Sequence, residues 1–126
     1  MFLGMDGGGT KTAFVLLDRH GEIRATHQGG SAYYLETGMP AVRTLVNEGI
    51  RTVLRAAGIS TSELLYAFFG LPVHGEDDRT AELDTLPADT LAADRYACGN
   101  DMVCGWAGSL AGEDGINVVA GTGSIC

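Results

Sequence analysis

The sequence has few cysteines and little positive charge, and it lacks any long apolar run. Its 126 residues include three cysteines, an odd number without a metal-like arrangement, which favours a reducing cytoplasm. Eight Lys and Arg stand against sixteen Asp and Glu, and this net charge of -8 argues against nucleic acid or an anionic membrane as the main partner. No run reaches the roughly 18 apolar residues of a membrane span, and the start lacks the basic segment of a signal peptide.

Glycine is abundant instead. The chain has 19 glycines, about twice the usual share, which predicts many tight turns. Its apolar content of 45% is ordinary for a globular protein, and its length suits one compact domain. Because the chain is acidic, a phosphate ligand would have to be bound by backbone dipoles and a metal ion.

Three consecutive glycines follow Asp6 and lie between two apolar stretches, which predicts a strand, a glycine turn and a second strand. Glycines allow positive φ and a close approach to a ligand, and successive backbone N–H groups form a concavity that suits an anion. Thr10 and Thr12 add hydroxyl donors, and Lys11 could neutralise phosphate charge. The carboxylate of Asp6 favours Mg²⁺ between it and the phosphates. The alternative is an ordinary glycine-rich hairpin turn.

Two better-known phosphate loops are excluded at this position. The Walker loop needs Gly-Lys-Ser/Thr at the start of a helix, but here Thr10 precedes Lys11 and a strand follows. The dinucleotide-binding fingerprint needs a third glycine three residues after the second, and Thr12 stands there.

The remaining pattern predicts a sheet with flanking helices. A long helix is expected over 37–57, with Pro40 in its first turn, Gly58 as its stop and an apolar face that packs across the first strands. Three antiparallel strands are expected first, then a strand buried on both faces, then two more. The strands are expected over 1–5, 13–18, 22–28, 64–71, 94–98 and 115–120, short helices or turns over 80–93, and a helix over 102–110.

Several polar residues are candidate substrate contacts. Tyr33 and Tyr34 lie in a small-residue loop and could line a sugar or base pocket or cap the core. His74 follows the 64–71 strand, and loops at the carboxyl ends of such strands hold ligand contacts in α/β sheets, although a solvated loop is the alternative. Asn100 and Asp101 lie at a strand-to-helix junction, where one residue suffices as the N-cap and the other stays available.

The last residues form a second small-residue turn of the phosphate-binding kind, Gly121-Thr-Gly-Ser124, after which the chain stops at Cys126. A strand that enters a tight turn needs a partner strand on its way out. We therefore expect residues 1–126 to be the N-terminal part of a longer protein. Cys98 and Cys104 are interpreted as buried small apolar residues.

The order of three motifs resembles the ribonuclease-H-like (actin-like ATPase) domain of the sugar kinase/Hsp70/actin superfamily. More narrowly, it resembles the N-acetylglucosamine kinase branch and the related BadF/BadG/BcrA/BcrD ATPases. The motifs are 6–12, Asn100-Asp101 at the start of a helix, and 120–124. The resemblance implies an α/β fold in which a mixed five-stranded sheet, with a further terminal hairpin strand, is flanked by helices.

The resemblance also assigns roles to residues. It implies that Asp6 holds Mg²⁺ through water and that Asp101 is the base that accepts a proton from a sugar hydroxyl. Tyr33, His74 and Asn100 remain candidate sugar contacts. The residues that match the two phosphate loops around ATP are Gly8, Gly9, Thr10, Lys11 and Thr12 in the first, and Gly121, Thr122, Gly123 and Ser124 in the second.

The function implied is that of an ATP-dependent kinase for N-acetylglucosamine, glucosamine or a related amino sugar, as a cytoplasmic homodimer. We expect the C-terminal adenosine-binding domain to lie outside these 126 residues, which alone are expected to be inactive. Sugar-binding members tend to have an asparagine where this chain has 31–34, which leaves the exact sugar open. The alternatives are an ATPase that activates a CoA-ester reductase or dehydratase through an iron–sulfur cluster, or a non-catalytic ATP switch.

Overall fold

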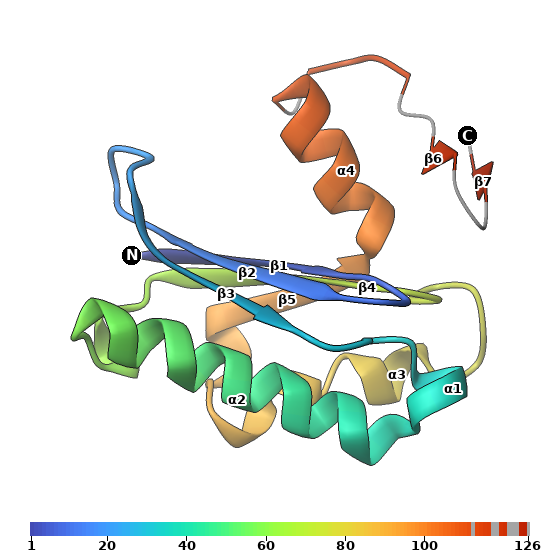
Figure 1. Cartoon of the computed structure of the whole chain (residues 1–126), viewed down its shortest axis with the longest axis horizontal. Coiled ribbons are helices and arrows are strands. Elements are labelled where there is room, and N and C mark those ends of the chain that lie inside the picture. The colour runs from blue at the N-terminus through green and yellow to red at the C-terminus, as the bar shows by residue number, and fades with distance from the viewer. Residues whose placement is uncertain (112, 117–118, 121–123, 126) are drawn as a thin grey trace.

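The computed structural model of the chain describes residues 1–111, 113–116, 119–120 and 124–125. Five strands form one mixed sheet in the order β3-β2-β1-β4-β5 (Figure 1). β1 pairs antiparallel with β2 and parallel with β4, while β2 pairs antiparallel with β3 and β4 parallel with β5. The strands are β1 (Phe2–Gly7), β2 (Thr12–Leu17), β3 (Ile23–Gly29), β4 (Tyr66–Leu71) and β5 (Tyr96–Asn100). The expected mixed five-stranded sheet is confirmed.

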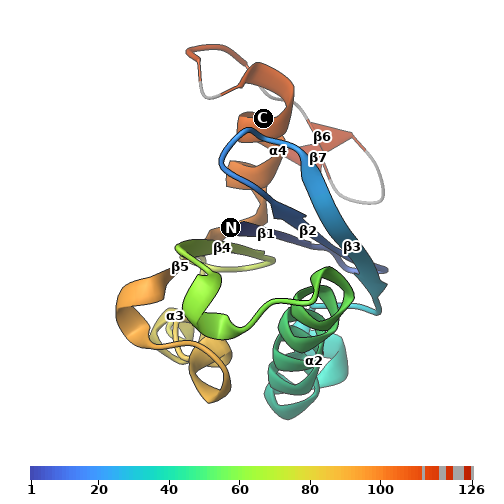
Figure 2. The same ribbon diagram turned by 90° about the vertical axis from the view of Figure 1, so that its left-hand side faces the viewer.

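Helices cover the two faces of the sheet unequally. The helices α1, α2 and α3 lie on one face, and α4 stands on the other, on the same side as the short hairpin of β6 and β7 (Figures 1 and 2). Their bounds are α1 (Tyr34–Thr37), α2 (Met39–Ala57), α3 (Thr80–Leu83), α4 (Asp101–Leu110), β6 (Val119–Ala120) and β7 (Ser124–Ile125), with 3-10 turns η1 (Thr61–Glu63), η2 (Leu86–Asp89) and η3 (Ala93–Arg95). Among the described residues, none of the helices is long and apolar enough to cross a bilayer.

The core lies between the sheet and α2. Strand alternation turns Leu3 and Met5 of β1 toward α2, and turns Phe2 and Asp6 toward the α4 side. The buried residues of α2 recur at helical spacing, as the sequence predicts: Met39, Val42, Val46, Asn47, Gly49, Ile50, Val53 and Leu54. The helix starts at Met39 rather than at 37 because Gly38 has a positive φ of 87°, and it ends at Gly58 with φ 68°.

The expectation that the 64–71 strand is buried on both faces is wrong. On the face that looks toward α2, Phe69 and Leu71 are fully buried. On the other face, Phe68 is half-buried and Tyr66 is 44% exposed. The reason is that α4 stands over one end of the sheet (Figure 1) and lies against β4 at Gly70, so the rest of this face is not covered by described residues.

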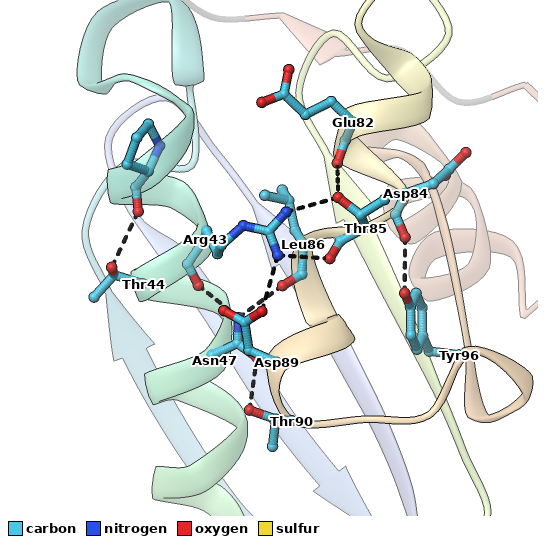
Figure 3. A network of polar contacts seen from close by, with 11 residues as sticks. Arg43, Thr44, Asn47, Glu82, Asp84, Thr85, Leu86, Asp89, Thr90 and Tyr96 are labelled. Atoms are coloured by element: carbon cyan, nitrogen blue, oxygen red, sulfur yellow. Dashed lines mark hydrogen bonds and ion pairs between the residues drawn. The ribbon is translucent and has the colours of Figure 1, made fainter.

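A polar network centred on the buried Asn47 ties the 80–95 segment to α2 (Figure 3). The side chain of Asn47, which is 2% exposed, donates to the Leu86 carbonyl at 2.7 Å and accepts from the Thr90 hydroxyl at 2.7 Å. One turn earlier, the Arg43 guanidinium donates to the Thr85 carbonyl at 2.9 Å. The two bonds of Asn47 satisfy polar groups that burial would otherwise leave without partners. They also fix the chain segment that leads into β5, and so to the residues that begin α4.

Candidate functional site

A cleft of about 400 Å³ opens on the α4 side of the sheet. Its walls are the loop that follows β1 and the first turns of α4. The lining residues are Asp6, Gly7, Gly8, Gly9, Thr10, Lys11, Ala13, Asp101, Met102 and Gly105. The fold thus brings together residues 6–11 and residues 101–105, two motifs far apart in sequence.

The glycine loop is a tight turn closed by its own backbone. The N–H of Gly8 donates to the carbonyl of Lys11 at 3.0 Å. A Cβ on Gly8 would lie 2.8 Å from that same oxygen, whereas a Cβ on Gly9 would meet nothing within 4 Å. The loop does not use the positive φ that glycine allows: the glycines with positive φ in the described chain are Gly21, Gly38, Gly58 and Gly75. Here the lack of a side chain provides space for turn closure at Gly8 and leaves open space beside Gly9.

Asp6 lies at the end of β1 and, by strand alternation, on the cleft side of the sheet. Its backbone is paired with Ala13 on one side and with Gly70 on the other, so strands on both sides fix the position of the Asp6 Cα. The carboxyl group reaches solvent, but the cleft walls displace part of its water, and this desolvation raises its pKa.

Asp101 begins α4 and faces the same cleft. The N-cap is Asn100, whose Oδ1 accepts from the backbone N–H of Met102 at 3.0 Å, and this leaves the Asp101 carboxylate available. Burial raises the pKa of Asp101 most, and the negative charges of Asp6 and Glu76 raise it further. The backbone N–H groups of Met102 and of Asp101 itself act in the opposite direction. Two carboxylates whose charges repel each other therefore share one cleft.

Thr12 is not placed as the sequence suggested. It is fully buried, and its hydroxyl donates to the Gly30 carbonyl at 2.8 Å. The side chain is on the α2 face of β2, so it anchors the 29–30 segment and is turned away from the cleft. By contrast, Thr10 and Lys11 are exposed and line the cleft.

The three candidate sugar contacts lie outside the set of described residues that line the cleft. Asn100 uses its amide group to donate to the His74 carbonyl at 3.1 Å and to Glu76 at 2.8 Å. The ring of His74 is bonded through Nε2 to Asp84 at 2.8 Å. Tyr33 is half-buried, and its backbone N–H donates to Ser31 at 3.1 Å. Asn100 thus holds the 72–79 loop against the start of α4, and His74 ties the same loop to the end of α3.

Three of the four residues in the second expected phosphate turn, Gly121, Thr122 and Gly123, lie outside the described residues. Of Ser124 the structure gives its place in β7, where it pairs with Ala120.

Comparison with known proteins identifies a family and two relatives that this chain resembles. The sequence matches the family described as the BadF/BadG/BcrA/BcrD ATPase family over residues 3–126. The chain belongs to this family. It is 28% identical over 137 residues to the N-acetyl-D-glucosamine kinase of Dictyostelium discoideum, a match that covers 99% of the chain and 42% of the relative.

A solved structure supports the same placement of this BadF/BadG/BcrA/BcrD-family chain. It is that of a Chromobacterium violaceum protein that has been assigned as an N-acetylglucosamine kinase. The two share 26% sequence identity with a TM-score of 0.73, over 98% of this chain and 42% of the other. The chain thus spans about two-fifths of the length of these relatives, and its resemblance to the family and to its fold is confirmed.

Two residues that line the cleft were not predicted from the sequence. Met102 and Gly105 line the cleft beside Asp101. Their positions one and four residues after Asp101 place them on one helical face, and this spacing is the signal that could have found them. Glu76, whose charge acts on Asp101, carries no such signal because it comes from a different loop.

Cys98 and Cys104, the two cysteines that the structure describes, are unpaired and half-buried. Burial raises the pKa of Cys98 to about 12 and that of Cys104 to about 11. The thiol of Cys104 donates to the Met5 carbonyl at 3.3 Å. Thiols with such raised pKa values stay protonated near neutral pH and are poor nucleophiles and poor metal ligands.

Proposed function

We propose that residues 1–126 form the N-terminal, phosphate-binding domain of an ATP-dependent amino sugar kinase. The observation that carries this proposal is the meeting of Asp6, the glycine loop and Asp101 in one cleft. The substrate class, N-acetylglucosamine, glucosamine or a related amino sugar, is supported by the names of the two relatives. The reaction class is phosphoryl transfer to a hydroxyl group.

The glycine loop would bind the phosphates of ATP through its backbone. The open space beside Gly9 admits a phosphate oxygen, and the exposed Thr10 and Lys11 add a hydroxyl and a positive charge. In an acidic domain, fixed backbone dipoles suit an anion better than net charge does. The second turn, 121–124, would supply further donors, while Thr12 stabilises the loop from beneath.

The donor set fits Mg²⁺. Asp6 and Asp101 offer hard carboxylate oxygens, and among the described residues no group of three or more His, Cys, Asp or Glu could hold a metal by itself. That combination suits Mg²⁺, which binds through one or two carboxylates together with phosphates and water. We assign Asp6 as the residue that holds it, and the ion would neutralise phosphate charge when bound.

Asp101 would act as the general base. The sugar hydroxyl oxygen forms a bond to the γ-phosphorus of ATP, the bond from that phosphorus to the ADP oxygen breaks, and the hydroxyl proton passes to Asp101. The raised pKa of Asp101 increases its affinity for that proton. Asn100 positions Asp101, His74 orders the neighbouring loop, and Tyr33 remains our proposed sugar contact.

A second domain would hold the adenosine, since the relatives are more than twice as long as this chain. We call the chain together with that domain the complete kinase, and place it in the cytoplasm as a homodimer. The alternative as an activator needs cysteines that can hold an iron–sulfur cluster. Cys98 packs against the core and Cys104 donates to a backbone carbonyl, so neither thiol is positioned to hold a cluster.

The test is a coupled assay of ADP release from the complete kinase with a panel of hexoses, hexosamines and N-acetylhexosamines. We expect ATP turnover that depends on an amino sugar, and no measurable turnover by residues 1–126 alone, because the latter lack the adenosine site and cleft closure. Sugar-independent turnover together with an iron–sulfur absorbance would instead support the activator.

A further inference from the structure

The first turn of α4 lies directly on Gly70 of β4. A Cβ placed on Gly70 would be 2.6 Å from the Cys104 sulfur, 3.2 Å from the Asp101 Cα and 3.2 Å from the Met5 carbonyl oxygen. Gly70 is also the residue that pairs with Asp6 across the parallel ladder of β1 and β4. One position without a side chain therefore touches the strand that carries Asp6 and the helix that carries Asp101.

Cys104 fastens the same helix turn to β1. Its sulfur donates to the carbonyl of Met5, the residue before Asp6, at 3.3 Å. Cys104 stands three residues after Asp101, so it lies on the same side of the helix one turn further on. Asn100 also fixes the start of the helix, through its contacts with the 74–76 segment.

We propose that Gly70 and Cys104 are positioning residues that set the separation between Asp6 and Asp101. This role rests on the proposed kinase function. Gly70 lets the helix approach the sheet until sulfur and strand are in contact, and the Cys104 bond to Met5 sets the direction of that approach. Neither residue is among the described residues that line the cleft, so their effect on catalysis passes through Asp101.

The contact distances predict what a methyl group at position 70 would do. The sulfur would have to move by about 1 Å to restore an ordinary contact, and the rigid helix would carry Asp101 with it. Displacements of about 1 Å in a catalytic group cost about a hundredfold in rate. Binding of ATP and sugar should change little, because the glycine loop and its phosphate donors stay in place.

The experiment is a double-mutant cycle of Gly70→Ala and Cys104→Ala in the complete kinase. We expect Gly70→Ala to lower kcat about 10- to 100-fold with KM for ATP and sugar within about threefold, and Cys104→Ala to lower kcat several-fold. The double variant should recover much of the loss caused by Gly70→Ala, because removing the sulfur makes room for the new methyl group. Gly4→Ala on β1 is the matched control, since its Cβ would meet nothing within 4 Å.

Three results would overturn the role. The first is a Gly70→Ala variant whose kcat equals that of an active wild type. The second is a double variant whose kcat loss is the product of the two single losses. The third is a double variant that regains the thermal stability lost in Gly70→Ala but keeps its low kcat. If Gly70→Ala does not fold, Cys104→Ala alone decides, and an unchanged kcat there counts against the proposal. A wild type without sugar-dependent turnover would instead overturn the kinase function itself.

Discussion

Replacing Gly9 by alanine separates the binding role of the glycine loop from its folding role. Gly9 and Gly4 are both surrounded by open space, since an added Cβ would meet nothing within 4 Å at either position. They differ in place: Gly9 lines the cleft, and Gly4 is on β1 outside it. Gly8 provides the contrast, because its Cβ would lie 2.8 Å from the Lys11 carbonyl oxygen.

The structure sets the size of each effect. Gly9→Ala and Gly4→Ala need no positive φ and meet no atoms, so the free energy of unfolding should stay the same or rise by about 0.4–1 kcal/mol. If a phosphate oxygen occupies the space beside Gly9, the new methyl group removes one hydrogen bond to a charged group, worth about 1.5–3 kcal/mol. That corresponds to about a 10- to 100-fold rise in the dissociation constant of ATP. Gly8→Ala should lower stability by about 1–3 kcal/mol as well.

The assay has two parts. Urea unfolding followed by circular dichroism measures stability, and calorimetric titration of the complete kinase with Mg-ATP measures affinity. We expect Gly9→Ala to keep its unfolding midpoint and lose ATP affinity, Gly8→Ala to lose both, and Gly4→Ala to lose neither. Unchanged ATP affinity in Gly9→Ala would refute the claim that a phosphate approaches this loop, which would then be an ordinary hairpin turn.

Three further predictions concern stability and pH. Asn47→Ala should lower the free energy of unfolding by about 2–4 kcal/mol, because it leaves the buried Leu86 carbonyl and the partly buried Thr90 hydroxyl without their partner. An effect as small as that of the exposed control Thr44→Ala in urea unfolding would contradict this. Glu76→Gln keeps an acceptor for Asn100 but removes a charge that raises the pKa of Asp101, so the acidic limb of the pH profile of kcat/KM should move to lower pH. An acidic limb that stays in place or moves to higher pH would count against Asp101 as the base. Since folding raises the pKa of Cys98 from 9.0 to about 12, the folded state holds that proton more tightly, and stability from this thiol should be full below pH 9 and be lost between pH 9 and about 12. Cys98→Ala should flatten that decline in urea midpoints, and an unchanged slope would show that the thiol does not titrate as described.

The long helix was predictable because its apolar residues repeat over five turns, and local sequence also gave its stop at Gly58. Its first residue was placed two positions early because Gly38 interrupts the chain in a conformation that the pattern does not reveal. The junction of Asn100 and Asp101 was likewise readable, since a capping residue followed by a free carboxylate is a local feature.

The orientation of Thr12 could not be predicted, and the reason is physical. Residues 13–17 are apolar on both faces of β2, so alternation does not say which face meets α2. The partners of Asn100 and the contact of Gly70 with Cys104 depend on how distant segments pack, which local patterns do not contain. The incomplete cover of β4 has the same origin, because an apolar run does not show how far α4 reaches along it.

The most direct test of the central claim is the turnover of Asp101→Asn in the complete kinase at saturating Mg-ATP and amino sugar. The substitution keeps the size of the side chain at the start of α4 but removes its ability to take a proton. The account predicts a kcat lower by about two to four orders of magnitude, with ATP and sugar affinities within a few-fold of the wild type. A kcat close to that of the wild type would contradict the assignment of this cleft as the phosphoryl-transfer site.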